Sequence, residues 1–131
     1  MKNTRGFTLI ELMITIAILA IIVGIAVPAY QNQVEKTRRA DAIAGLTQAA
    51  QQLERCFTRN NSYADCAYQT TSPDDYYLIS RASDSAGSTF ALTATADETG
   101  PQKNDDCSPF TLNHLGAKGA ESTTDRCWGQ N

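Results

Sequence analysis

The sequence has little of what enzymes and metal sites need. It holds one histidine, His114, among 131 residues. It contains no nucleophile elbow, no phosphate-binding loop and no Cys-x-x-Cys pair, which are spacings typical of hydrolases, nucleotide-binding enzymes and zinc sites. We therefore predict that the chain is not an enzyme, that it uses no cofactor and that it binds no metal. His114 is interpreted as a surface turn residue.

One metal alternative remains open in a polar stretch of the second half. Asp97, Glu98, Asp105 and Asp106 lie close together in the sequence, and carboxylate oxygens are the ligands that calcium prefers. An acidic loop is usually hydrated without any ion. Hydration is therefore the favoured interpretation, and calcium binding is the alternative.

Charge is absent from a long stretch near the start of the chain. No charged residue occurs at positions 12–34, and residues 12–29 are almost wholly aliphatic. About 20 apolar residues span the hydrocarbon of a bilayer, so this stretch can form a membrane helix. It is too long for a usual signal-peptide core, and residues 26–29 form a poor signal-peptidase site. A plain membrane anchor and a secretory signal are the two simplest alternatives.

Positive charge is also in deficit. The 11 Lys and Arg residues are outnumbered by 14 Asp and Glu residues, which gives a net charge of −3 at pH 7. Because the phosphates of nucleic acid need cations, we do not expect nucleic acid to be a partner. Lys36, Arg38 and Arg39 follow the uncharged stretch. We interpret this cluster as a solvated face or a lipid headgroup contact, with DNA binding as the alternative.

The cysteines number four and all lie in the polar part of the chain: Cys56, Cys66, Cys107 and Cys127. An even number of cysteines outside the cytosol indicates two disulfides. Pairing each cysteine with its neighbour in sequence closes two local loops and is favoured, whereas the two crossed pairings remain alternatives. Each bridge would stabilise a small domain by about 3 kcal/mol.

Helical spacing continues beyond the uncharged stretch. Apolar residues recur at steps of three and four, at Ile43, Leu46, Ala50, Leu53 and Phe57. This pattern predicts one face of a helix. A helix over residues 7–57 would be about 75 Å long, whereas a domain of 100 residues has a radius of gyration of about 13 Å. We therefore expect its first half to project and its second half to pack on the remaining chain.

Short alternating segments follow the helix. They lie at residues 75–82, 89–96, 110–113 and 117–120, of which the last has the weakest pattern. In the second segment, Phe90, Leu92, Ala94 and Ala96 would face inward. The predicted fold class is α+β, with a long N-terminal helix packed on a small antiparallel β-sheet.

Glu11 is the residue that a plain anchor or a secretory signal does not explain. A carboxylate near the head of a membrane segment costs a few kcal/mol unless it is paired or near the interface. Residues 6–11, Gly-Phe-Thr-Leu-Ile-Glu, resemble the processing motif of class III signal peptides, which belong to type IV pilins and pseudopilins. The resemblance implies that a prepilin peptidase cuts between Gly6 and Phe7 and methylates the new amino group of Phe7.

The resemblance also divides the chain. Residues 1–6 would be the prepilin leader, residues 7–29 the transmembrane and filament-core helix, and residues 30–131 the periplasmic or surface domain. Glu11 lies four residues after Phe7, on the same helical face. It can therefore pair with the cationic amine of Phe7 in its own subunit, or in a neighbouring subunit during assembly.

Gly24 and Pro28 are two residues within the same helix that can kink or weaken it. Pro28 lacks the N–H that would bond the Gly24 carbonyl. The pair is either a tolerated kink or a weak point that unwinds when subunits pack in a filament, and the family resembles this chain at both positions. Residues 76–79, 110–113 with Gly116, and 127–128 resemble PilE-type minor pilins more loosely.

We therefore predict a structural subunit of a type IV pilus. It would sit in the inner membrane before assembly and in an extracellular pilus afterwards. The resemblance implies other pilin subunits, the prepilin peptidase and the pilus assembly machinery as partners. A type II secretion pseudopilin and a DNA-uptake pilin are the two alternatives.

Overall fold

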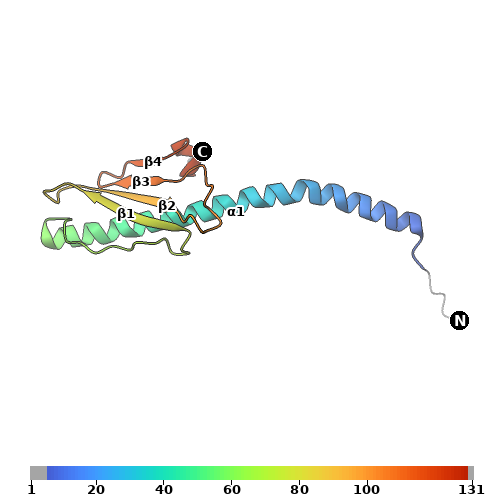
Figure 1. The fold of residues 1–131 in the computed structure, drawn as a ribbon, viewed down its shortest axis with the longest axis horizontal. Coiled ribbons are helices and arrows are strands. Elements are labelled where there is room, and N and C mark those ends of the chain that lie inside the picture. Colours follow the sequence, from blue (N-terminus) through green and yellow to red (C-terminus); the bar gives the residue numbers. More distant parts are fainter. Residues whose placement is uncertain (1–5, 130–131) are drawn as a thin grey trace. The chain divides into compact units, whose positions relative to one another are not determined.

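The computed structural model describes residues 6–129, so the predicted leader lies outside the described residues except for Gly6. Two helices and four strands make up the described chain: α1 (Leu9–Asn60), β1 (Tyr77–Ser83), β2 (Phe90–Ala96), β3 (Phe110–Asn113), β4 (Lys118–Ala120) and α2 (Thr124–Cys127) (Figure 1). The strands pair antiparallel in chain order, β1-β2-β3-β4. The predicted α+β fold is confirmed.

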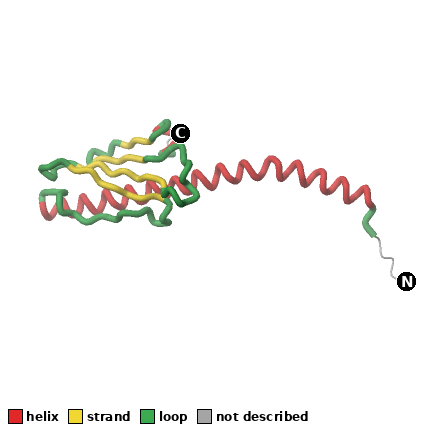
Figure 2. The backbone as a smooth tube through the Cα atoms, in the orientation of Figure 1, coloured by secondary structure: helices red, strands yellow, loops and turns green. Residues whose placement is uncertain are grey.

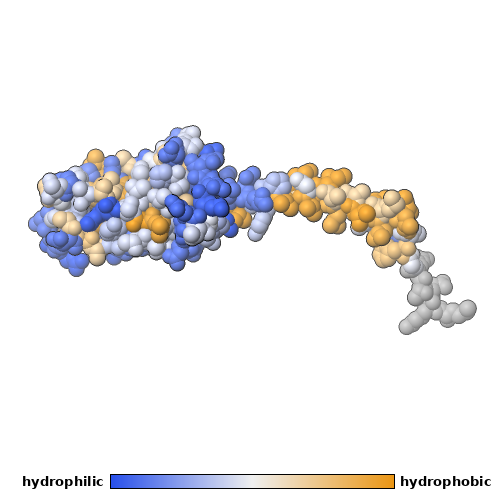
Figure 3. Space-filling view, in the orientation of Figure 1, coloured by the Kyte–Doolittle hydropathy of each residue, from blue (hydrophilic) through white to orange (hydrophobic). Residues whose placement is uncertain are grey.

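The described chain divides into two compact units after Val34. In the first unit, α1 has no partner, and every described residue from 6 to 33 is exposed. Figure 3 shows this surface as hydrophobic. In the second unit, the rest of α1 packs along the four-stranded sheet, and a long loop connects β2 to β3 (Figure 2).

The core of the second unit lies between α1 and the sheet. Its helical side consists of small and medium residues that are fully buried, namely Ala42, Leu46, Ala49 and Leu53. The predicted apolar face is therefore partly wrong, because Ile43, Ala50 and Phe57 are only partly buried at its margin. Small residues let helix and sheet approach closely. The buried face of α1 is consequently centred on these small residues. The larger residues of the predicted apolar pattern lie partly at its margin.

Gly45 marks a close approach of α1 to β1 and to the segment that precedes it. A Cβ atom at this position would lie 2.8 Å from Ile79 Cδ1 and 3.0 Å from the Cα atom of Ser72. Gly45 itself is buried. The Ser72 backbone cannot move aside as a flexible side chain can, so the spacing between α1 and the segment before β1 depends on the missing side chain.

The sheet has the alternation that the sequence predicts. Phe90, Leu92, Ala94 and Ala96 are all buried, so β2 supplies much of the inner face. Strand β1 begins two residues later than expected because Asp75 adopts a positive φ of 59°. That residue belongs to the turn preceding the strand, a conformation that aspartate tolerates better than most residues.

Two disulfides close the loops around this core. Cys56 pairs with Cys66 and Cys107 pairs with Cys127, with Cα–Cα distances of 5.8 Å and 5.6 Å. These are the two local pairings that the sequence favours. The first ties the end of α1 to the loop that follows it, and the second ties the loop after β2 to α2.

The spacing at Gly45 can be tested by adding a side chain there. We expect Gly45→Val to lower the free energy of unfolding by about 2 kcal/mol, because overpacking a tight core displaces backbone. Gln48→Val, which places the same residue on the exposed face of α1, is the matched control and should change stability far less. Urea unfolding of the full chain in detergent measures both; equal effects would contradict the close-approach argument.

Candidate functional site: the start of α1 and the basic end of the domain

The start of α1 carries an N-terminal cap that the sequence analysis missed. Thr8 precedes the helix, and its Oγ1 accepts a hydrogen bond from the backbone N–H of Glu11 at 3.3 Å. Thr-x-x-Glu is the spacing of a capping box, so the signal was present in the sequence. Glu11 is also the acidic residue of the first helical turn, where a negative charge offsets the helix dipole.

Glu11 therefore has a local role besides the predicted role in assembly. Its side chain is exposed, as is that of Phe7, which is 87% exposed. The pairing between Glu11 and the Phe7 amine requires the cleaved chain. It stays a prediction here, together with the cut between Gly6 and Phe7 and the methylation of Phe7.

The large apolar side chains that follow are unburied in the described structure. Those that are about half exposed or more include Leu9, Ile10, Leu12, Ile16, Leu19, Ile22 and Ile25. By length and composition, α1 is the one helix among the described residues that could cross a membrane. An apolar surface of this extent is stable only when lipid or protein covers it.

Gly24 and Pro28 do not interrupt α1, which is helical throughout this region. A Cβ atom at Gly24 would meet nothing within 4 Å, so no packing within the chain requires glycine there. The predicted weak point stays a prediction, because it concerns a change that accompanies assembly.

In the second unit, a buried polar network ties α1 to the sheet and to the loop after β2. Arg39 Nε lies 2.7 Å from Asp105 Oδ1, and the Tyr77 hydroxyl donates to Asp105 Oδ2 at 2.6 Å. The side chain of Asp105 is only 1% exposed. Gln102 Nε2 completes the network by donating to the Tyr77 hydroxyl at 3.1 Å. Burial and the hydrogen bond to Asp105 raise the pKa of Tyr77 above its ordinary value.

This network corrects two interpretations made from the sequence. Arg39 is not part of a solvated face, because its guanidinium is paired with Asp105. Asp105 is not a solvated carboxylate of an open loop, because its side chain is buried and paired with Arg39. Among residues 6–129, no group of three His, Cys, Asp or Glu side chains could hold a metal ion.

Arg38 is also turned toward the domain, with its guanidinium carbon 5.4 Å from the centre of the Tyr76 ring. Of the predicted basic cluster, Lys36 alone is classed as exposed. The solvated-face interpretation therefore fits Lys36 and not its two arginine neighbours. Sequence alone could not separate them, since their partners come from distant segments.

His114 is half-buried rather than fully exposed. It follows β3 directly, as a turn residue would. Its ring lies against Phe90, with the ring centres 6.2 Å apart, and its Nδ1 atom is buried without a hydrogen-bond partner. The expectation of a surface turn is therefore correct for the backbone and wrong for the side chain.

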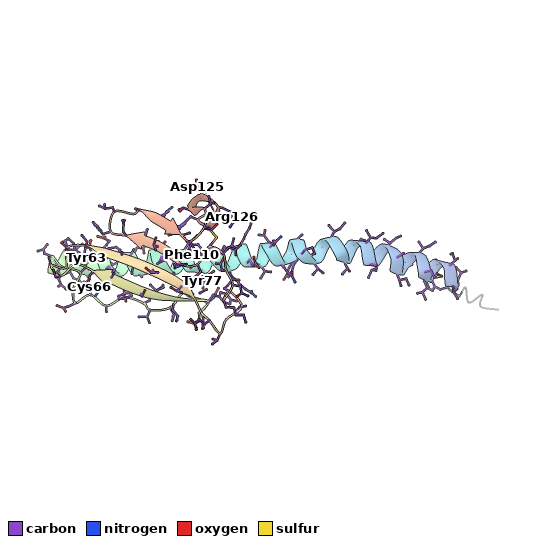
Figure 4. The ribbon with its side chains drawn as sticks, turned by 45° about the horizontal axis from the view of Figure 1, so that its top comes forward. Tyr63, Cys66, Tyr77, Phe110, Asp125 and Arg126 are labelled. Atoms are coloured by element: carbon purple, nitrogen blue, oxygen red, sulfur yellow. A yellow bond between two sulfur atoms is a disulfide. The ribbon has the colours of Figure 1, made fainter. Side chains whose placement is uncertain are left out.

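A cavity of about 270 Å³ lies at the end of the domain near α2. Residues from α1 and from the C-terminal segment line it: Lys36, Arg39, Ala40, Ile43, Arg126, Cys127, Trp128 and Gly129. Lys118 of β4 lies over the Trp128 ring, 5.2 Å from its centre. Figure 4 shows Arg126 beside Asp125 at this end of the sheet. The sequence analysis singled out Lys36 and Arg39 but missed Arg126, because α2 joins them only in the folded chain.

The buried network predicts a sharp difference between two adjacent aspartates. Asp105→Ala should lower the free energy of unfolding by about 3 kcal/mol, because it leaves the mostly buried charge of Arg39 without its partner. Asp106→Ala removes an exposed carboxylate and should change stability by less than about 0.5 kcal/mol. Urea unfolding of the full chain compares them, and similar losses for the two variants would refute the role of the network.

Comparison with known proteins agrees with this architecture. Residues 28–111 match the family model described as "Type IV minor pilin ComP, DNA uptake sequence receptor", and residues 1–27 match "Prokaryotic N-terminal methylation motif". Among solved structures, a type IV pilin from Shewanella oneidensis aligns with a TM-score of 0.56 and 29% identity, covering 69% of this chain and 96% of that one. The Neisseria meningitidis minor pilin PilV aligns with a TM-score of 0.58 over 72% of this chain and 94% of that one; at 20% identity it supports the fold alone.

Curated relatives are fimbrial proteins or are named for prepilin peptidase. Prepilin peptidase-dependent protein D of Escherichia coli strain K12 is 38% identical over 66 residues, which are 50% of this chain and 45% of that protein. Type IV major fimbrial protein FimA of Dichelobacter nodosus is 37% identical over 47% of this chain and 40% of its own length. The match thus spans less than half of either relative.

A longer match extends to the domain. Fimbrial protein EcpC of Eikenella corrodens is 35% identical over 105 residues, which cover 76% of this chain and 67% of that protein. A single family model also covers well over half of the chain. This chain therefore belongs to the type IV pilins, in the minor pilin family described as that of ComP.

Proposed function

We propose that this chain is a structural subunit of a type IV pilus, made as a prepilin and assembled through the first part of α1. The observation that carries the proposal is the uncovered apolar surface of residues 9–30, which begins at the capped first turn, directly after Gly6 and Phe7. Burying one large aliphatic side chain stabilises by about 1.5–3 kcal/mol. Packing these helices together therefore keeps this surface out of water in the filament, and van der Waals contacts between the helices supply the free energy of assembly.

Before assembly, lipid covers the same surface. The uncharged stretch is long enough to span a bilayer. The precursor is therefore anchored in the inner membrane, with its domain in the periplasm. The prepilin peptidase cuts between Gly6 and Phe7 and methylates Phe7, after which the assembly machinery moves the subunit into an extracellular filament. Family membership and the methylation-motif match at residues 1–27 support this sequence of events.

Glu11 has its effect when the subunit docks. Cleavage creates a cationic amine at Phe7, and in an apolar filament core neither that amine nor the Glu11 carboxylate is stable without a partner. Pairing of Glu11 with the amine of an adjacent subunit would set the axial register of the incoming helix. Methylation retains the positive charge of the amine, so the pairing persists after modification.

Charge and helix capping at Glu11 can be separated by substitution. Glu11→Gln retains the capping-box spacing, since glutamine also serves at that position, but it removes the negative charge. We expect normal cleavage of this variant and at least a tenfold loss of its incorporation into pili, measured by quantitative blotting of sheared filaments. Thr8→Ala is the matched control, because it removes the cap and keeps the carboxylate.

The two variants give distinct results under the two roles. A charge role predicts that Thr8→Ala still assembles and that Glu11→Gln does not. Wild-type incorporation of Glu11→Gln, or an equal loss for both variants, would contradict the register role of the Glu11 charge.

A DNA-uptake pilin is the second candidate, and the family description favours it. The sequence analysis argued against a nucleic-acid partner from the net charge of −3. Net charge is a weak argument when cations gather locally, and Lys36, Lys118 and Arg126 do so at one end of the domain. The expectation that nucleic acid is not a partner therefore stays untested. DNA binding at this end of the domain is the specific alternative to it.

Sequence-specific DNA binding can be tested on the full chain in detergent. A DNA receptor would change the anisotropy of a labelled genomic duplex, would prefer that duplex over a shuffled one of equal composition, and would lose affinity as salt rises. Equal affinity for both duplexes would show that the chain binds DNA only nonspecifically, which would exclude a sequence-specific DNA receptor. Absence of any anisotropy change at low salt would remove the DNA-uptake candidate and leave the structural subunit.

A further inference from the structure

The cavity at the end of the domain, called the basic pocket below, gathers positive charge without acidic lining residues. Its charged lining consists of Lys36 from α1, Arg39 from α1 and Arg126 from α2. Arg39 is neutralised by Asp105, whereas Arg126 Nη2 donates to the uncharged Ser122 Oγ at 3.1 Å. Lys36 and Arg126 therefore leave the basic pocket with a positive charge that the described ion pairs do not neutralise.

Trp128 forms one wall of the basic pocket in a fixed orientation. Its Nε1 donates to the Gly119 carbonyl at 2.9 Å, and Lys118 covers its ring. The Cys107–Cys127 disulfide holds the adjacent residue. Tryptophan is enriched where membrane proteins meet lipid head groups.

The basic pocket also follows the apolar stretch closely in sequence. Lys36 comes two residues after Val34, the last residue of the uncharged segment. At 1.5 Å per helical residue, about 3 Å of α1 separates the two positions. With residues 7–29 in the hydrocarbon, Lys36 is the first cation that follows on α1, and its long side chain can reach the head groups.

We propose that the basic pocket binds the phosphate head group of an anionic phospholipid, such as phosphatidylglycerol, while the precursor is in the membrane. This proposal rests on the membrane-anchored precursor of the proposed function and specifies its lipid partner. The bound head group neutralises Lys36 and Arg126 and holds the domain against the bilayer. Extraction of the subunit into a filament removes the lipid and frees the basic pocket.

Size and charge favour one head group over a nucleic acid. The basic pocket has a volume of about 270 Å³ and two unneutralised lining cations. Duplex DNA binding depends on many phosphates along an extended basic surface. Glu35 and Asp125 adjoin Lys36 and Arg126 in the sequence, so a polyanion that extends beyond the basic pocket is repelled more than a single head group.

Trp128 is the only tryptophan of the chain, so its fluorescence reports on the basic pocket. The full chain is placed in zwitterionic nanodiscs, and phosphatidylglycerol carrying a head-group nitroxide quencher is titrated in. Trp128 should be quenched at a much lower mole fraction of this lipid than of phosphatidylcholine with the same quencher. Lys36→Gln with Arg126→Gln should raise the mole fraction needed about 30-fold, at about 1 kcal/mol per basic residue near an anionic surface.

Two further variants separate a specific site from general attraction. Arg55→Gln with Arg59→Gln makes the same charge change at exposed positions near the other end of α1 and should leave the lipid preference unchanged. Lys36→Arg with Arg126→Lys retains the charge and should retain the preference. Thermal unfolding midpoints equal to that of the unchanged chain show that each variant is folded.

Several results would overturn the proposal. Equal quenching by the two lipids would do so, as would an equal effect of the two Gln pairs. Displacement of the lipid by a short DNA duplex at lower phosphate concentration than by inorganic phosphate would assign the basic pocket to nucleic acid instead. If the chain does not co-elute with the nanodiscs in size-exclusion chromatography, the membrane-anchored function itself fails. Co-elution without lipid preference rejects only the lipid site.

Discussion

The first part of α1 presents an apolar surface that the chain itself does not cover, and this constraint governs the rest of the molecule. Every described residue from 6 to 33 is exposed, although most are aliphatic. Water cannot solvate such a surface favourably, so the helix needs lipid before assembly and copies of itself afterwards. The cap at Thr8 and the carboxylate of Glu11 lie at the end of this surface, where a charge can define register without interrupting the apolar packing.

The second unit must remain folded while its anchor changes surroundings. Its core is small, and much of its helical side consists of alanine and glycine, so hydrophobic burial alone provides a limited reserve of stability. Two disulfides and the Arg39–Asp105–Tyr77 network add links between segments that are distant in sequence. These links also position α2 and Trp128 against α1, which creates the basic pocket.

Sequence reasoning reached the fold class, the four strands and the family, because each depends on local periodicity or on a short motif. It found Leu46 and Leu53 but missed the centre of the buried face, since Gly45 and Ala49 are inconspicuous in the sequence. It also treated Arg39 and Asp105 as solvated groups. Their pairing spans 66 residues, and no spacing rule connects positions so far apart. Arg126 and Trp128 joined the candidate site for the same reason, only after folding.

The central claim is that the chain is cut after Gly6 and then covered by other subunits in a filament. The intact, non-reduced mass of the chain recovered from sheared surface pili tests this most directly. We expect a polypeptide that starts at Phe7, carries one added methyl group and retains both disulfides. Recovery of the chain only from membranes, at its uncut mass and absent from the pili, would contradict it.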